Sequence, residues 1–158
     1  MLFKYKSPVG IIYCLFEGSE LIEVSIGEKP FYIDTIPQTV TLLKGSFKEE
    51  LDAYFNGRLK KIKQKIKFIS RNDFEHKVWL ALREIPFGET RSYKLIAERI
   101  GSPKAVRAVG QALKKNPMPI ILPCHRVIAS DGSIGGFSCG VEIKRLLLEK
   151  EGINFNVA

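Results

Sequence analysis

The spacing of hydrophobic and polar residues changes about halfway along the chain. In the first part, an apolar run over residues 9–16 is followed by a turn and by an alternating run over residues 21–26, and this pattern predicts a β-hairpin. Apolar residues at positions 47, 51, 54 and 55 then share one face of a helix. We expect that helix to begin after an N-cap at Ser46 and to end at Asn56-Gly57.

A cluster of lysines follows this helix. Lys60, Lys61, Lys63, Lys65 and Lys67 are interspersed with apolar residues, mostly in alternation. A period of two predicts an edge strand whose lysines face water, which also protects the edge from pairing with other chains. The first seventy residues are therefore expected to form a small β-sheet with one packed helix.

From residue 70 onwards the apolar spacing becomes helical. A first helix is expected after a cap at Asn72 or Asp73, and it should end at the turn formed by residues 86–88. A second helix over residues 93–100 should end at Gly101, because glycine is favoured just after the last helical residue.

A third helix is expected over residues 104–115, with Ser102 as its N-cap and Pro103 in its first turn. Two helices joined by a Gly-Ser-Pro turn make a helix-turn-helix pattern, which binds DNA in some proteins and is a plain helical hairpin in others. This third helix has a low profile that allows close approach either to a neighbouring helix or to a nucleic-acid strand. Its small residues are Ala105, Ala108, Gly110 and Ala112.

The composition is that of a folded α/β (α+β) protein. Of the 158 residues, 45% are hydrophobic and 27% are charged, close to the globular average. We divide the chain into a small N-terminal β-sheet-plus-helix domain over residues 1–70 and a mainly helical domain with a helix-turn-helix over residues 71–158. No apolar run approaches the roughly 18–20 residues of a membrane span, and no signal peptide is recognised. We expect no membrane partner and an intracellular location, cytoplasmic at the nucleoid or nuclear in a eukaryote.

The chain is basic, with 25 Lys and Arg against 17 Asp and Glu and a formal charge of +8. Such a field attracts polyanions, nucleic acid first. The segment from Arg99 to Arg126 contains no acidic residue, so we expect a phosphate backbone to lie there. Its basic residues are Arg99, Lys104, Arg107, Lys114, Lys115 and Arg126.

A candidate nucleophile lies in the sequence Pro123-Cys124-His125-Arg126, after an apolar strand expected over residues 120–122 and before a glycine-rich loop. Positive charge beside Cys124 would lower the pKa of its thiol and favour the ionised, reactive form. A buried and inert cysteine is the alternative, because neighbouring residues of a strand point to opposite faces. No metal site is expected, since the chain has no C-x-x-C pair and no histidine pair at ligand spacing.

Six short motifs of the second half carry a resemblance to a known family, in both their order and their spacing. They are Phe87-Gly88-Glu89, Ser92-Tyr93, Pro103–Gly110, Asn116–Ile120, Pro123–Val127 and the loop over residues 130–140. Together they resemble the O6-alkylguanine-DNA alkyltransferases, which are the methylated-DNA–protein-cysteine methyltransferases. The resemblance covers about residues 71–152 strongly, whereas the first seventy residues resemble the family's variable N-terminal domain only through residues 51–57.

The resemblance implies a direct and irreversible transfer of an alkyl group from guanine O6 to the protein's own Cys124, once per molecule. His125 matches the base that deprotonates Cys124 through a water molecule, and Glu151 matches the acid that orients His125. Asn116 matches the residue that braces the active-site turn. Tyr93 matches the hydroxyl that donates a proton to the leaving guanine.

The resemblance also places duplex DNA on the third helix. Arg107 matches the arginine that fills the base stack after the target nucleotide is flipped out. The small residues Ala105, Ala108 and Gly110 would let the helix enter the minor groove. The other expected DNA contacts are Lys104, Ser92, Thr90 and Arg126.

A guanine pocket is expected between the acceptor cysteine and the glycine-rich loop. Its residues, by resemblance, are Val127, Gly135, Gly136, Phe137, Ser138 and Cys139. Cys139 stands where many members have glycine, and its larger side chain would narrow access for bulky adducts. The expected partner is double-stranded DNA carrying O6-alkylguanine, bound by a monomer that uses neither a metal nor another cofactor.

Two other functions fit parts of the pattern. A damage sensor or DNA-binding regulator would recognise alkylguanine without reacting, but such relatives lack the acceptor cysteine that this chain has. A cysteine hydrolase would need an oxyanion hole, and the acid-free basic segment would have no role in it. Alkyl transfer is therefore the favoured interpretation.

Overall fold

The computed structural model describes residues 1–27 and 39–154. The chain divides into two compact units, Met1–Ile69 and Ser70–Ala158. Both units combine helices with strands, which confirms the expected α/β class. Within the described residues, no helix is long and apolar enough to cross a membrane.

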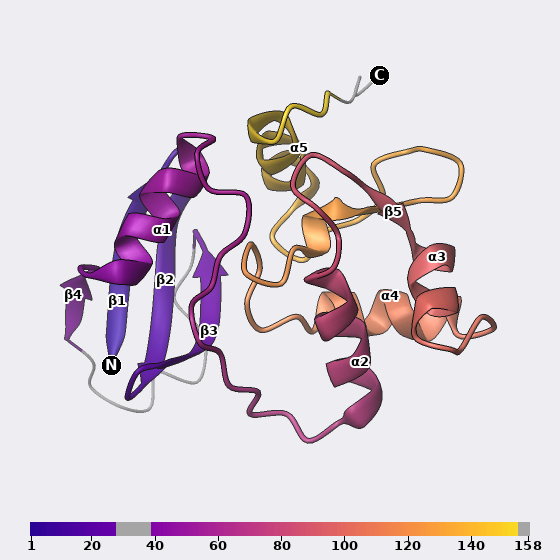
Figure 1. Cartoon of the computed structure of the whole chain (residues 1–158), viewed down its shortest axis with the longest axis horizontal. Helices are drawn as coiled ribbons and strands as arrows, with labels where there is room; N and C mark the ends of the chain where they lie inside the picture. The colour runs from indigo at the N-terminus through magenta and orange to yellow at the C-terminus, as the bar shows by residue number, and fades with distance from the viewer. Residues whose placement is uncertain (28–38, 155–158) are drawn as a thin grey trace. The chain divides into compact units, whose positions relative to one another are not determined.

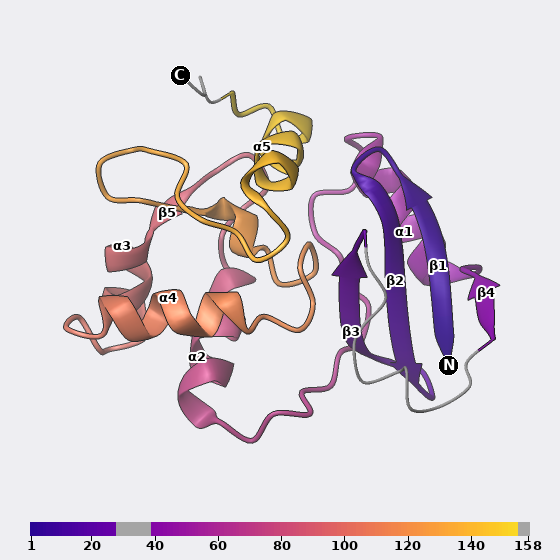
Figure 2. The same cartoon turned by 180° about the vertical axis from the view of Figure 1, so that it is seen from behind.

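A four-stranded sheet forms the first unit, with the strand order β3-β2-β1-β4 (Figures 1 and 2). Its strands are β1 (Leu2–Ser7), β2 (Gly10–Glu17), β3 (Glu20–Ile26) and β4 (Val40–Leu42). β2 and β3 are antiparallel, with Cys14 opposite Val24, which confirms the predicted hairpin. The sequence prediction did not include β1, which pairs antiparallel with β2, or β4, which pairs parallel with β1.

Helix α1 (Ser46–Phe55) lies along one face of this sheet (Figure 1). Its buried residues are Phe47, Leu51 and Tyr54. The predicted end at Asn56-Gly57 is confirmed, with a φ of +72° at Gly57. The predicted N-cap is wrong, because Ser46 is already helical. Gly45 holds the cap position with a φ of +85°, a conformation that glycine adopts without steric strain.

The lysine-rich segment after α1 runs beside β3 but is not a strand. Within the described residues, Leu21 forms one isolated bridge with Ile66. The Leu21 N–H donates to the Lys65 carbonyl and the Leu21 carbonyl accepts from the Lys67 N–H, each at 2.9 Å. Residues 61, 63, 65 and 67 are exposed, with less exposed residues between them. The predicted alternation is therefore confirmed, whereas the predicted strand is wrong because a single bridge does not make a ladder.

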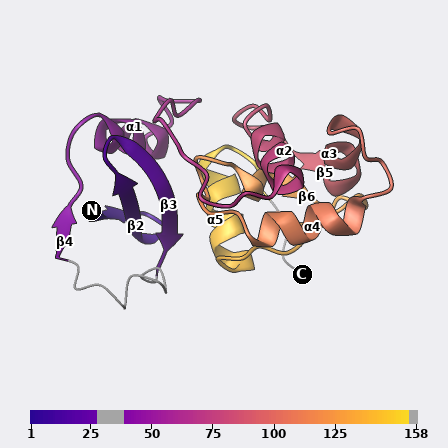
Figure 3. The ribbon, with the colours of Figure 1, turned by 90° about the horizontal axis from the view of Figure 1, so that it is seen from below.

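Three helices that contact one another form the framework of the second unit (Figure 3). They are α2 (Asp73–Leu82), α3 (Tyr93–Arg99) and α4 (Val106–Lys114). α2 begins as predicted, since the Asn72 side chain accepts a hydrogen bond from the Glu75 N–H at 3.0 Å. The Trp79 indole donates to the Ala112 carbonyl at 2.9 Å and thereby ties α2 to α4.

The turn between α3 and α4 differs in part from its prediction. Gly101 follows the end of α3 as expected, with a φ of +81°. Ser102 does not cap α4, because its carbonyl accepts from the Ala105 N–H at 2.9 Å and so closes a separate turn that includes Pro103. Ala105 takes the cap position without a side-chain hydrogen bond, and the helix begins at Val106.

Short elements lead the chain past the candidate nucleophile. They are β5 (Arg91–Ser92), a single turn of 3-10 helix η2 (Cys124–Arg126), β6 (Val127–Ile128) and helix α5 (Val141–Lys150). β5 pairs in parallel with β6. The strand predicted over residues 120–122 is wrong, since these residues form a buried turn in which Ile120 has a φ of +79°.

The N-caps predicted from the sequence, Asn72 for α2 and Ser102 for α4, can be compared by measuring the stability of one variant of each. Asn72→Ala should lower the free energy of unfolding by about 1 kcal/mol, because it removes a real N-cap. Ser102→Ala should change it by less than about 0.5 kcal/mol, because Ser102 caps no helix. Urea unfolding of both variants, followed by circular dichroism, measures the difference. Equal losses would contradict the assignment of these two ends.

Candidate active site

The turn before Cys124 is held by one buried side chain. The Asn116 amide nitrogen donates to the Leu122 carbonyl at 2.8 Å, and its amide oxygen accepts from the Met118 N–H at 2.9 Å. These bonds span the segment in which Ile120 adopts its positive φ. They explain why an apolar run that reads as a strand forms a turn instead. Asn116 also hydrogen-bonds to Cys124.

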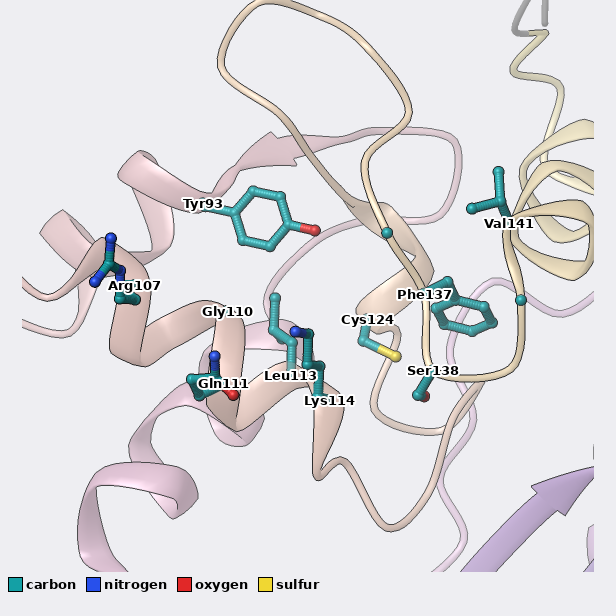
Figure 4. Close-up of a pocket in the computed structure, with 12 residues that line it drawn as sticks. Tyr93, Arg107, Gly110, Gln111, Leu113, Lys114, Cys124, Phe137, Ser138 and Val141 are labelled. Carbon is teal, nitrogen blue, oxygen red and sulfur yellow. The ribbon is translucent and has the colours of Figure 1, made fainter.

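Cys124 begins η2 and is only 4% exposed. Its sulfur points into a pocket of about 770 Å³, toward the loop that carries Phe137 and Ser138 (Figure 4). The opposite wall of the pocket comes from α4, and Tyr93 projects into it from the start of α3 (Figure 4). The lining residues are Tyr93, Arg107, Gly110, Gln111, Leu113, Lys114, Cys124, Gly136, Phe137, Ser138, Gly140 and Val141.

Burial raises the pKa of the Cys124 thiol to about 12, although the hydrogen bond from Asn116 and the charge of Lys144 act in the opposite direction. The thiol is therefore neutral at neutral pH. The expectation that adjacent positive charge ionises it is wrong, because the neighbouring His125 and Arg126 side chains bond to Glu151 instead. Any reaction at this sulfur must remove its proton during the reaction.

His125 and Glu151 form the buried pair that the resemblance implies. Nε2 of His125 lies 2.5 Å from Oε2 of Glu151, and neither side chain is exposed. Because an ionised carboxylate only accepts hydrogen bonds, the proton is assigned to Nε2. Burial lowers the pKa of His125 even though Glu151 acts to raise it. The ring is thus neutral, and Nδ1, which has no hydrogen-bond partner among the described residues, is left as a proton acceptor.

Arg126 lies on the other side of the same carboxylate. Its Nε donates to Oε1 of Glu151 at 2.8 Å, its Nη2 donates to Oε2 at 3.1 Å, and its Nη1 donates to the Ile85 carbonyl at 2.8 Å. The residue is only 6% exposed. The expectation that Arg126 contacts DNA is therefore wrong, because its donors are engaged inside the protein.

Lys144 is a second buried cation, and the sequence prediction missed it. Its ammonium group on α5 donates to the Val127 carbonyl at 2.6 Å and to the Gly136 carbonyl at 3.0 Å, so it joins the acceptor segment to the pocket loop. Burial lowers the pKa of Lys144 to about 8. Its spacing of three and four residues from the buried Leu147 and Leu148 was the available signal that it lies on the inner face of the helix.

Tyr93 is half-buried, with its hydroxyl directed into the pocket (Figure 4). Burial raises the pKa of Tyr93, and a negative charge on Cys124 would act in the same direction, so the hydroxyl keeps its proton. The loop comes very close here, since a Cβ atom on Gly135 would lie 3.1 Å from the hydroxyl oxygen, and Gly135 has a φ of +72°. Only glycine fits that position without strain.

Only some of the residues predicted for the guanine pocket line the observed pocket. Gly136, Phe137 and Ser138 line the pocket, whereas Val127, Gly135 and Cys139 do not. The sequence prediction did not place Gln111 or Lys114 in the pocket, although it listed Lys114 among the basic residues; they follow Arg107 by four and seven residues on one face of α4.

The expected DNA contacts lie on α3, α4 and the segments before them. Lys104 and Ala108 are exposed, and Ala105 and Thr90 are half-buried. Ser92 has a local role, because its hydroxyl accepts from the Leu95 N–H at 3.1 Å and caps α3. Within the described part of the chain, no group of three or more His, Cys, Asp or Glu side chains is placed to hold a metal ion.

Acid should destabilise the protein through Glu151. Burial raises the pKa of this carboxyl, but the hydrogen bonds from His125 and Arg126 and the charge of Arg126 outweigh burial and lower the pKa to about 2. The stabilisation is complete above the unfolded value of about 4.3 and is lost as the pH falls toward about 2; it corresponds to about 3 kcal/mol. Urea unfolding at stepped pH should show this loss in the wild type and in Glu142→Gln, an exposed control on α5, but not in Glu151→Gln. Equal acid sensitivity in all three proteins would contradict the prediction.

The chain matches known proteins over most of its length. Residues 73–153 match the family model described as "6-O-methylguanine DNA methyltransferase, DNA binding domain". The methylated-DNA–protein-cysteine methyltransferase of Methanosarcina barkeri is 51% identical over 156 residues, which cover 94% of this chain and 95% of the relative. That of Methanosarcina acetivorans is 41% identical over 153 residues, which cover 94% and 96%.

Among solved structures, Mycobacterium tuberculosis OGT in complex with DNA resembles this fold with a TM-score of 0.82 and 40% identity, over 95% of this chain and 91% of that chain. The stretch matched by the family model includes Cys124 and the motifs around it. The chain belongs to the family of methylated-DNA–protein-cysteine methyltransferases.

Proposed function

We propose that this protein repairs DNA by transferring the alkyl group of O6-alkylguanine to Sγ of its own Cys124, once per molecule. One observation carries the proposal: Cys124 faces a pocket of about 770 Å³, and the residue next to it belongs to a buried His125–Glu151 pair. The names of the relatives support the same reaction. The DNA in the Mycobacterium tuberculosis complex supports DNA as the partner.

The transfer begins from a neutral thiol. Nδ1 of His125 takes the thiol proton through a bridging water, and Glu151 stabilises the charge that forms on the ring. The sulfur forms a bond to the alkyl carbon while the bond from that carbon to guanine O6 breaks. Tyr93 supplies the proton that returns the leaving group to guanine. The product is a thioether, which has no ready route back, so each molecule reacts once.

The target base must leave the duplex to reach this sulfur, at a cost of a few kcal/mol. Arg107 lies on α4 at the wall of the pocket (Figure 4), and its planar guanidinium is suited to occupy the gap in the stack. All the groups named in this reaction lie between residues 93 and 151 of one chain. We therefore propose that a monomer acts on O6-alkylguanine in duplex DNA, in the cytoplasm or nucleus where the DNA lies.

A non-reacting damage sensor is not favoured. A sensor needs the pocket and α4, but it has no use for a thiol that hydrogen-bonds to Asn116 and stands beside a proton-accepting histidine. The cysteine, its base and the tyrosine together favour transfer over recognition alone.

Methylation of one cysteine tests the reaction directly. A duplex that contains one O6-methylguanine should leave one methyl group on the peptide with Cys124 and stop at one per protein. Cys124→Ser should bind the duplex and repair nothing, while Cys139→Ser should still transfer, because Cys139 does not line the pocket. Peptide mass mapping reads all three proteins. Binding without methylation would indicate a sensor, and continued turnover would indicate a hydrolase.

Replacing Arg107 separates base extrusion from chemistry. Arg107→Ala should slow repair of duplex DNA by about tenfold or more, as expected if it removes at least about 1.4 kcal/mol of a few-kcal/mol extrusion step. The same variant should react with free O6-methylguanine base at nearly the wild-type rate. Arg99→Ala is the control, since Arg99 pairs with Glu84 and lies outside the pocket. Equal losses on both substrates would count against the stacking role.

A further inference from the structure

Arg126 is a buried cation of the active site to which the proposed reaction assigns no task. We propose that Arg126 is a positioning residue: it balances the charge of Glu151, so that His125 stays uncharged and Nδ1 can take the thiol proton. This inference rests on the proposed function. It replaces the DNA contact that the sequence suggested for Arg126.

The Glu151 carboxylate lies between two side-chain donors, His125 and Arg126. Oε1 accepts from Nε of Arg126 and, at 3.2 Å, from the Gly88 N–H; Oε2 accepts from Nη2 of Arg126 and from Nε2 of His125. The third donor of Arg126 bonds to the Ile85 carbonyl, so the guanidinium is fixed to the segment after α2. The planar fork of arginine suits this bidentate contact, whereas lysine offers a single point charge.

Charge balance shows why this contact matters for His125. A buried carboxylate that faced only a histidine would draw a proton onto the ring, because an unpaired buried charge is unfavourable. A protonated ring cannot accept the proton of Cys124. With Arg126 bonded to both oxygens of Glu151, the carboxylate is already compensated.

Of the other charged groups around His125, one acts in the same direction as Arg126. Lys144 on α5 is a second cation, and both Lys144 and Arg126 lower the pKa of His125 beyond the effect of burial, whereas Glu151 raises it. Cys124, also on η2, is neutral. α2 also packs against η2, but its buried carboxyl, Glu75, hydrogen-bonds to Ser70 and is paired with Lys115.

The first test measures the protonation of His125 by NMR in the full-length protein, over about pH 5–9. The chain has two histidines, so His76→Gln assigns the signals. Arg126→Met should raise the pKa of His125 by at least about one unit, a tenfold change in protonated fraction. Arg126→Lys should raise it less, because the charge is kept. Arg91→Met, which removes a surface partner of Glu89, should leave it unchanged.

The second test compares the pH profiles of single-turnover repair. Arg126→Met should lose repair rate severalfold near neutral pH, in proportion to the protonated fraction of His125, and recover as the pH rises through the raised His125 pKa. A loss that is equal at every pH, with an unchanged His125 pKa, would mean a merely structural role. Weaker DNA binding with a smaller salt dependence would mean a phosphate contact. Either result overturns the proposal.

Removal of Arg126 leaves a buried charge on Glu151, and Arg126→Met can therefore fail to fold. In that case Arg126→Lys decides: a measurable rise in the pKa of His125 supports the proposal and no rise overturns it. The double variant Arg126→Met/Glu151→Gln removes both charges and should keep His125 neutral, while a raised pKa there would overturn the proposal. The pKa of His125 is measured in the protein without DNA, so this test does not depend on alkyl transfer. Failure of the proposed function would appear separately, as unmethylated Cys124 in the wild type.

Discussion

The second unit depends on one buried carboxylate. Glu151, just after α5, accepts hydrogen bonds from His125 and Arg126 of η2 and from the Gly88 N–H. Through Arg126 it also reaches the Ile85 carbonyl after α2. Removal of one partner of such a buried group is strongly destabilising, because the remaining charge is left uncompensated. The same contacts that join these segments therefore also set the tautomer and charge of the proposed base.

The resting acceptor is a buried neutral thiol rather than an exposed thiolate. Burial raises the pKa of Cys124 to about 12, and a thiol in this form is a poor nucleophile toward small electrophiles in solution. For a protein proposed to react once, this is an advantage, since each accidental alkylation would waste a molecule. In the proposed reaction, the thiol proton moves to His125 when a substrate in the pocket allows the sulfur to bond to the alkyl carbon. Asn116 and Lys144 then favour the developing negative charge.

Local patterns in the sequence predicted the elements whose cause is local. The apolar run of β2, the alternation of β3, the Asn72 cap and the glycines that end α1 and α3 are confirmed because each depends on neighbouring residues. The strand over residues 120–122 failed because the Asn116 side chain bends that segment into a turn. The motif resemblance located Cys124, His125 and Glu151, but no local pattern could reveal that Arg126 is buried, since its partners Ile85 and Glu151 lie far away in sequence. For Lys144 the helical spacing indicated the inner face of α5, but not its partners Val127 and Gly136.

The basic residues also differ in whether they have partners that are distant in the sequence. Of the six basic residues between Arg99 and Arg126, Arg99 pairs with Glu84, Lys115 pairs with Glu75, and Arg126 is buried on Glu151. Within the described residues no ion pair involves the other three, Lys104, Arg107 and Lys114. Two of these line the pocket from α4, and Lys104 lies just before that helix. Arg107 and Lys114 thus carry positive charge from the acid-free stretch to the wall of the pocket that also contains Cys124. Because the attraction of phosphate falls off within about 10 Å at moderate salt, these two charges act on the part of the proposed duplex that lies next to the acceptor.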